Sequence, residues 1–526
     1  MLIASSLATF ESFFGLSVPS IVLLSPRCST ISNQQHQAIM PALLDLSNEL
    51  LHSIFSHTQA DDLARLSETC RSLHQFINSD EMLWKEVHLA VFDDPKEQSV
   101  TVTSWQEELS RLWRMHKILS SDKEETKIQN MDTLATTITR LLQASSPDPE
   151  SRSRSWLRKH FEADSINHHA LLCKFSLYHD TLGIRATRSS VIPKDLEQLS
   201  AKLHVLHGVY CECSVHMGSD YDAGAPVHAY ARSRVYDLRR YDESNSWGPF
   251  LDDFSHRVDW MKLSCIMTVI LCEQRRYCSH LGSSYLPVCH LPFAGAAPNT
   301  FQEPGFLPGS IVGSLQSSPE PKSPHSEASM VKEPSLSLDE QDPYGVAGTW
   351  FRIVLFLDYN DLYNFNFSQG TIPNTMPRPP LQKSQATRFI VVRLHVTRIE
   401  PITRDGEQQL PKVYFEGDSR SYEHGTVQDG QSTIKGYVRQ NPEGEIWWTT
   451  MSIFNGEERW RSECIQVGGL RSDRGTLGTW FDKDYSDDGP VGPTCFWKVS
   501  NAHLDRNMPS FMRRAKSGQR GWRRYG

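Results

Sequence analysis

Cysteine and histidine are the side chains of this chain best suited to hold a metal ion, and they occur in two short groups. The groups are Cys211, Cys213 and His216, and then Cys278, His280, Cys289 and His290. Structural zinc is commonly held by CxxC or HxxxH pairs, whose turns point both side chains inward. The CxC and CxH spacings suit that geometry poorly. We therefore expect ordinary core or loop side chains here, with no metal and no cofactor.

Other patterns that carry chemistry are weak. An acidic run could pass for a calcium loop: Asp482, Asp484, Asp487 and Asp488. The glycine that such a loop needs at its sixth position is Asp487, which favours a solvated turn. Neither a phosphate-binding GxxxxGK[ST] loop nor a GxSxG nucleophile elbow occurs in the sequence. We therefore predict no catalytic residues and a protein that is not an enzyme.

Tryptophan and arginine offer a better candidate for a binding site. The residues are Trp447, Trp448, Arg459, Trp460, Arg461 and Arg471. Both residue types are enriched where binding energy concentrates, and arginine can fork onto a carboxylate or phosphate. Two interpretations stay open. Either these side chains form a substrate-binding pocket, or the tryptophans are core and the arginines pair with Asp482, Asp484 or Glu463.

These residues lie in the last third of the chain, residues 343–504, which we expect to be β-rich. The segments rich in β-branched and aromatic residues are 350–356, 389–399, 413–415, 434–438, 445–454 and 461–467. Asn441-Pro442-Glu443-Gly444 is expected to form a hairpin turn. Adjacent Trp447 and Trp448 imply that both faces of their strand are covered. The pattern predicts a mostly antiparallel sheet or a small barrel.

Residues 91–292 are expected to form a mainly helical, α+β linker domain. Apolar residues recur at helical spacing in four stretches: 105–116, 131–142, 156–161 and 196–206. Asp259 is a candidate N-cap for a further helix that begins at Trp260. The alternating segment from Tyr230 to Tyr241 predicts a strand. The predicted fold class is therefore α+β and multidomain.

Three segments are predicted to lie outside these domains. Residues 293–342 are rich in proline, serine and glycine, and such a segment cannot offset the entropy of ordering, so we expect a disordered linker. Ser318-Pro319 and Ser323-Pro324 are candidate sites for proline-directed phosphorylation. Residues 1–39 are expected to be a disordered extension. The basic tail, residues 505–526, could serve nuclear import, attract RNA or simply be solvated.

Composition narrows the class of protein. The chain has 526 residues, a formal net charge of −8 and 11 cysteines. The negative charge argues against nucleic-acid binding in general, and an odd number of cysteines favours reduced thiols in the cytoplasm or nucleus. Apolar runs are shorter than the roughly 18 residues that a membrane span needs. The apolar stretch Ile21–Leu24 lacks the preceding positive charge of a signal peptide, so we expect neither a membrane protein nor secretion.

The densest pattern in the chain is the stretch from Leu44 to Val87. Leu46, Leu50 and Ile54 recur at helical spacing behind Ser47, a good N-cap residue, and further apolar residues indicate three or four short amphipathic helices. A unit this small buries only a modest share of its surface. Some of its apolar side chains should therefore stay exposed, which predicts a protein partner.

This stretch, within a predicted domain of residues 40–90, resembles the F-box motif. Two positions depart from the family pattern: Ser47 stands where proline is usual and Leu73 where tryptophan is usual. The resemblance implies docking onto a Skp-type adaptor and, through it, a cullin. The implied adaptor-binding residues are Leu44, Leu46, Glu49, Leu50, Leu51, Ile54, Phe55, Leu63, Leu66, Cys70, Arg71, Leu83 and Trp84.

From Val235 onward the chain is also similar to large F-box proteins of filamentous fungi, through segments such as YDLRRY, WGPF and ERWRSE. Together these resemblances imply the substrate receptor of a Skp–cullin–F-box ubiquitin ligase, whose β domain holds an unknown target protein for ubiquitination. Two alternatives stay open. One is an enzyme with an unrecognised site in the β domain, and the other is a scaffold that binds the adaptor outside any ligase.

Overall fold

The structure, a computed structural model, divides into two compact units, Met1–Ser79 and Asp80–Gly526. It describes residues 43–95, 100–162, 165–173, 193–209, 226–281, 291–302, 337–368, 370, 372–374, 376–402, 409–423, 426–427, 432–486 and 488–503. Several predictions lie outside these residues: those on segment 1–39, the two Ser-Pro sites, Asp487 and the basic tail. The same holds for Cys211, Cys213, His216, Cys289 and His290, and for the side chains of Cys278 and His280.

The described part of the first unit, residues 43–79, contains three short helices, α3 (Asn48–Phe55), α4 (Ala60–Ser67) and α5 (Arg71–Ser79). Each buries one apolar stripe, as the helical spacing predicts. Leu63, Leu73 and Ile77 are almost fully buried. The rings of Phe55 and Phe76 lie 6.0 Å apart between centroids, which ties α3 to α5.

The second unit begins with helices. They are α6 (Glu81–Val91), α7 (Trp105–Leu119), α8 (Glu124–Gln129), α9 (Met131–Gln143), α10 (Arg152–His160), the π-helical turn η2 (His168–Cys173), α13 (Lys194–His207), α14 (Pro226–Val235), the 3-10 turns η5 (Leu238–Arg240) and η6 (Glu243–Asn245), and α15 (Trp260–Leu281). The helices predicted from apolar spacing are confirmed. The predicted cap of α15 is also present, because the Lys262 backbone N–H donates to Asp259 at 3.1 Å.

The predicted strand from Tyr230 to Tyr241 is wrong: the chain forms α14 and then η5 there. The alternating pattern misleads because α14 is buried almost all round, against α15 and neighbouring segments, so its polar residues do not mark a solvent face. Arg232, for example, is 2% exposed and donates to the carbonyl oxygen of Lys383. The local spacing of polar residues cannot show that an arginine is buried and bonded to a backbone carbonyl far away in the chain.

The last third forms an eight-stranded antiparallel β-barrel, which confirms the barrel among the two predicted forms. The strands are β1 (Gly348–Phe356), β2 (Ala386–Glu400), β3 (Lys412–Glu423), β5 (Ser432–Gln440), β6 (Ile446–Phe454), β7 (Glu457–Gln466), β8 (Thr476–Asp482) and β9 (Val491–Ser500), with the short β4 (Thr426–Val427) beside β3. Consecutive barrel strands are neighbours, and β1 closes the ring by pairing with β9. Asn441 and Gly444 form the predicted turn between β5 and β6.

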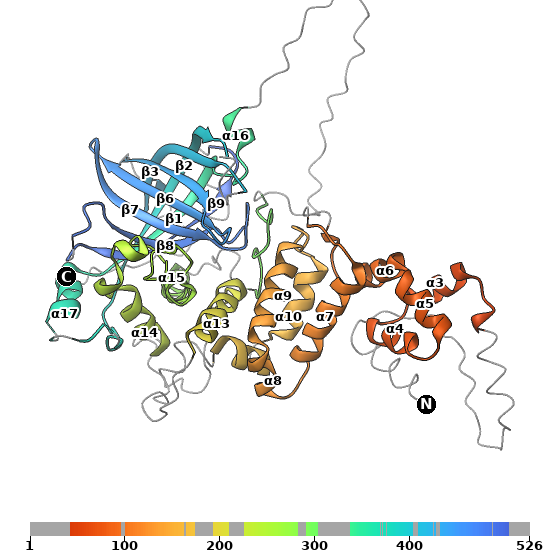
Figure 1. The fold of residues 1–526 in the computed structure, drawn as a ribbon. Coiled ribbons are helices and arrows are strands. Elements are labelled where there is room, and N and C mark those ends of the chain that lie inside the picture. Colours follow the sequence, from red (N-terminus) through yellow and green to blue (C-terminus); the bar gives the residue numbers. More distant parts are fainter. Residues whose placement is uncertain are drawn as a thin grey trace, which may run out of the picture. The chain divides into compact units, whose positions relative to one another are not determined.

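In this last third, two barrel strands and two short helices of the described residues were not predicted from the sequence. β8 carries a glycine, and β9 carries a glycine and a proline, which weaken a strand signal; both strands are held by pairing on both sides. Helix α16 (Leu338–Gln341) precedes the barrel, and α17 (Tyr359–Phe367) follows β1. Figure 1 shows α15 beside the barrel, where it packs against β8 and β9.

The barrel interior has an apolar part and a polar part. The apolar part includes Trp350, Phe415 and Trp448. The polar part is centred on Arg352, which is 3% exposed. Its guanidinium donates to three hydroxyl groups, those of Ser452, Ser462 and Thr494, at 3.3, 2.7 and 3.1 Å. Burial lowers the pKa of Arg352 to about 10, so the side chain stays charged at neutral pH.

Both ends of the predicted disordered linker are ordered, which corrects the predicted boundaries. Phe293, Ala296 and Ala297 are buried, and the Asn299 backbone N–H donates to the Leu470 carbonyl oxygen at 2.8 Å. Small residues allow this close packing: a Cβ atom on Gly468 would lie 2.8 Å from the Cα of Ala296. Residues 303–336 lie outside the described part of the chain.

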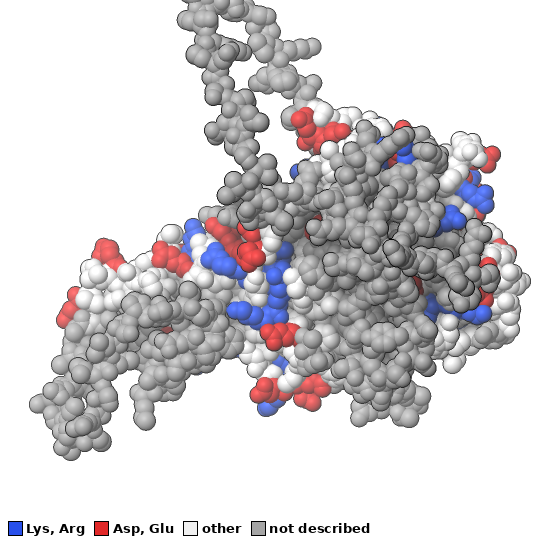
Figure 2. Space-filling view, turned by 180° about the vertical axis from the view of Figure 1, so that it is seen from behind, with Lys and Arg blue, Asp and Glu red and all other residues white. Residues whose placement is uncertain are grey.

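The described surface carries both acidic and basic side chains. In Figure 2, blue and red side chains lie close together over the coloured part of the face. Among the described helices, none combines the length and the apolar character that crossing a bilayer requires.

Candidate functional site

Helix α3 presents two apolar faces, one buried and one exposed. Leu51 and Phe55 are 5% and 2% exposed and belong to the core of the first unit. Leu50 and Ile54, one helical turn apart, are 53% and 46% exposed, and Leu44 just before the helix is 39% exposed. We call the exposed side chains of Leu50 and Ile54 on this helix the α3 face. Neighbouring exposed apolar side chains of this kind are a candidate surface for a protein partner.

The start of α3 differs in detail from the expectation. Ser47 occupies the N-cap position, but its side chain makes no capping hydrogen bond to the helix. The Ser47 hydroxyl and the backbone N–H of Glu49 bond to the Glu49 carboxylate instead, and these bonds lower its pKa. Glu49 is therefore a carboxylate held beside the α3 face.

The other residues implied by the motif fall into two groups. Leu46, Leu66 and Cys70 are half-buried, and Arg71 is exposed at the start of α5. Five are buried, which makes them part of the core rather than of a surface: Leu51, Phe55, Leu63, Leu83 and Trp84. Repeated leucines show that a segment is amphipathic, but only packing shows which of them face inward.

Helix α6 belongs to the second unit. Its N-cap Asp80 accepts the Leu83 backbone N–H at 3.0 Å, and Glu81 accepts the Trp105 backbone N–H at 2.8 Å. His88 lies against the ring of Trp105, with centroids 5.2 Å apart. The contacts of Glu81 and His88 with Trp105 join α6 to α7.

Comparison with protein-family models gives a match to the F-box-like family at residues 44–90. Residues 44–90 are an F-box-like domain. The match coincides with the stretch singled out by its motif, and it includes α3, α4, α5 and most of α6. Comparisons with curated proteins and with solved structures give no match, so the similarity to fungal F-box proteins stays a prediction.

Outside the F-box-like domain, the predicted tryptophan and arginine pocket is not assembled. Trp447 and Trp448 point to opposite faces of β6, as neighbours on a strand must. Trp448 lies in the barrel core, 5.0 Å from the ring of Trp350 between centroids. Arg459 lies near the start of β7 and Arg471 beyond its other end. The expectation that both faces of β6 are covered is confirmed, since both tryptophans are buried.

On the outer face of the barrel, Glu463 organises a buried network. Its carboxylate accepts hydrogen bonds from Trp447 Nε1 at 2.5 Å and Thr449 Oγ1 at 2.7 Å, and it pairs with Arg461 at 2.6 Å. Burial raises the pKa of Glu463, while Arg461 opposes that change. The open interpretation that arginine pairs with Glu463 is thus confirmed for Arg461. Trp460 is half-buried, with its ring 5.2 Å from that of Trp480.

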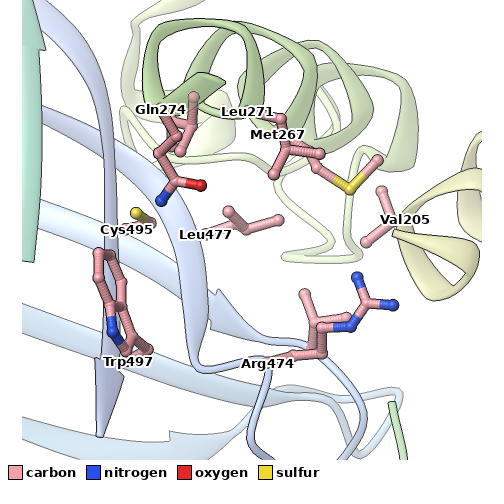
Figure 3. A pocket seen from close by; sticks show the side chains of 10 residues that line it. Val205, Met267, Leu271, Gln274, Arg474, Leu477, Cys495 and Trp497 are labelled. Atoms are coloured by element: carbon pink, nitrogen blue, oxygen red, sulfur yellow. The ribbon is translucent and has the colours of Figure 1, made fainter. Parts of the chain in front are cut away.

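A cavity between the helices and the barrel is too small for a ligand of metabolite size. Figure 3 shows Val205 on α13, Met267, Leu271 and Gln274 on α15, and Leu477 and Cys495 on the barrel around it. Its volume of about 30 Å³ leaves room for about two water molecules. Within the described residues, no group of three or more His, Cys, Asp or Glu side chains is placed to hold a metal ion.

Helix α17 carries a second exposed apolar surface, which was not predicted from the sequence. Tyr359, Tyr363 and Phe367 follow one another at intervals of four residues and are 51%, 45% and 47% exposed. Their ring centroids lie 6.3 and 5.0 Å apart in sequence order. We call these three side chains the α17 aromatic face. The spacing was visible in YNDLYNFNF, but nothing local showed that this side of the helix would remain uncovered.

Proposed function

We propose that this protein is a substrate receptor of a Skp–cullin–F-box ubiquitin ligase. The observation that carries the proposal is the F-box-like domain at residues 44–90 with its exposed α3 face. The domain would dock on a Skp-type adaptor, and the second unit would hold a target protein. The chain would then act through proximity, by raising the effective concentration of a target lysine near the loaded ubiquitin-conjugating enzyme. It would perform no chemical step itself.

The adaptor contact is tested by changing the exposed side of α3. The double variant Leu50→Ala, Ile54→Ala should lose co-purification with the adaptor, because each buried leucine or isoleucine side chain contributes about 1.5 to 3 kcal/mol. Changing Leu50 and Leu51 together would be a poorer test. Leu51 is buried, so a loss of adaptor binding could then result from a loss of folding. Recovery of the adaptor and of a cullin is measured by affinity purification of the full chain.

A matched control is available on the same helix. Asn48→Ala together with Ser53→Ala changes two exposed polar residues of α3 and should leave adaptor recovery unchanged. If the Leu50, Ile54 variant and this control recover equal amounts of adaptor, the α3 face does not bind the adaptor. Adaptor without cullin would favour the scaffold alternative over a ligase.

For the target, we propose contact through the α17 aromatic face. Half-exposed tyrosine and phenylalanine side chains on a rigid helix are typical anchors of protein interfaces. The double variant Tyr363→Ser, Phe367→Ser should keep the adaptor but lose proteins that accumulate on the receptor when the proteasome is blocked. The control, Asn360→Ala with Asn364→Ala, changes exposed polar residues of α17. Targets retained equally by both variants would show that this face is not the contact.

A further inference from the structure

The thiol of Cys272 lies against the imidazole of His228, in a pair that the proposed receptor function does not use. Cys272 is on α15 and His228 on α14, and the Sγ and Nδ1 atoms are 3.2 Å apart. The other ring nitrogen of His228, Nε2, lies 3.7 Å from Glu273 Oε1. His228 is fully buried, Glu273 is 8% exposed and Cys272 is half-buried.

A chain of hydrogen bonds holds the carboxylate on the far side of the imidazole. Gln385 Nε2 donates to Glu273 Oε1 at 3.4 Å, and the Tyr236 hydroxyl donates to Gln385 Oε1 at 2.6 Å. Tyr236 is fully buried and Gln385 is half-buried. The order of groups is therefore hydroxyl, amide, carboxylate, imidazole and thiol. They come from α14 and the residue after it, from α15 and from the segment before β2.

This order favours a thiolate. A carboxylate beside Nε2 stabilises the imidazolium ion, and an imidazolium ion beside sulfur stabilises the thiolate. The same arrangement of nucleophile, base and orienting acid activates cysteine in enzymes. Cys464 shows the opposite environment, because burial raises the pKa of its thiol to about 12. Of these two cysteines, only Cys272 combines partial exposure with a basic neighbour.

We propose that Cys272 is a reactive thiol and a site of covalent modification by soft carbon electrophiles such as α,β-unsaturated carbonyl compounds. The Cys272 proton moves to Nδ1 of His228, and the thiolate sulfur bonds to the β-carbon of the electrophile. The carbon–carbon π bond breaks, and its electron pair shifts toward the carbonyl group. The imidazolium then returns the proton to the α-carbon, so that no group leaves and no oxidant is needed.

N-ethylmaleimide, an electrophile of this class, is the probe. The full chain is treated at pH 7 for increasing times, and the labelling of each cysteine is quantified by peptide mass spectrometry. An ordinary thiol is only a few per cent ionised at this pH, so Cys272 should react about tenfold faster than Cys70, which is also half-buried. His228→Gln should bring the Cys272 rate down to that of Cys70, and Glu273→Gln should lower it less.

Cys265 provides an internal check on folding, because it lies on α15 and is 1% exposed. Protection of Cys265 in a variant shows that the helix remains packed. The proposal is overturned if wild-type Cys272 reacts no faster than Cys70, a comparison that needs no variant. It is equally overturned if both variants, with Cys265 protected, react at the wild-type rate.

Discussion

Glu463 and Arg352 are buried charged residues of one barrel, and they are stabilised in different ways. Glu463 faces outward and has an arginine, an indole N–H and a hydroxyl as partners. Arg352 faces the interior, where its hydrogen-bond acceptors are hydroxyl groups and the Phe496 ring lies 4.6 Å away. A buried charge is costly unless it is paired or hydrogen-bonded, so removing one partner from either network should destabilise the fold.

Substitution of Glu463 is therefore expected to destabilise the fold more than substitution of the exposed Glu457 on the same strand. Glu463→Gln removes the charge that pairs with Arg461 and leaves amide donors facing Trp447 and Thr449. Breaking such a buried pair typically costs about 3 to 5 kcal/mol in free energy of unfolding. The control Glu457→Gln lies exposed at the start of the same strand and should cost under about 0.5 kcal/mol. Urea unfolding measures both, and equal losses would contradict the assignment of Glu463 to the core.

At the level of elements, close approach between two segments decides which glycine positions tolerate a larger residue. Gly468, in the turn after β7, has a φ of +89° and lies against the backbone of Ala296. Gly456, in the turn between β6 and β7, has a φ of +85°, and a Cβ atom at this position would meet no heavy atom within 4 Å. The two glycines therefore share their backbone conformation but differ in contact with segment 291–302.

Replacing each glycine with alanine separates these two effects. Gly456→Ala should lose only about 1 to 2 kcal/mol, the cost of a left-handed conformation. Gly468→Ala has the same strain and must also displace Ala296, so its loss of stability should be larger. Thermal unfolding gives the comparison, and hydrogen exchange at the Asn299 N–H should quicken only in Gly468→Ala. Equal effects of the two changes would mean that segment 291–302 is not docked there.

For the second unit as a whole, buried neutral histidines should lower the free energy of unfolding as the pH becomes acidic. His88 and His204 are each 1% exposed, and burial lowers the pKa of each to about 4. The unfolded chain takes up protons on these residues below about pH 6.5, whereas the folded protein does not. The free energy of unfolding is therefore highest above pH 6.5 and falls as the pH drops toward 4.

The size of this effect can be measured by tryptophan fluorescence. All 13 tryptophans lie at or after Trp84, so the signal reports on the second unit. At about 1.4 kcal/mol per pH unit and residue, the two histidines should together lower the free energy of unfolding by about 4 kcal/mol between pH 7.5 and 5.0. His88→Phe, which keeps a ring against Phe92 and Trp105, should make the drop about 2 kcal/mol smaller, which is the share of one histidine. An unchanged pH dependence in this variant would rule His88 out as a cause.

Local patterns were sufficient for much of the architecture. The F-box motif, the helices α7, α9, α13 and α15, and six barrel strands follow from residue spacing and capping within a few neighbouring positions. The motif also located the F-box-like domain, because its order of leucines, charges and tryptophan lies in one continuous stretch. These features are local, and a single sequence contains all the information that specifies them.

Packing between distant segments decided the rest. The alternating residues of α14 form a helix because that segment is buried. Pairing in the barrel places Trp447 and Trp448 on opposite sides of its wall, and the α17 aromatic face remains exposed. Packing also brought His228 to Cys272, which lies 44 residues further along the chain. By itself, the sequence determined that this protein carries an F-box-like domain and a β-rich part. Only the tertiary structure decided which side chains meet and which remain exposed, because burial depends on residues that are far apart in the chain.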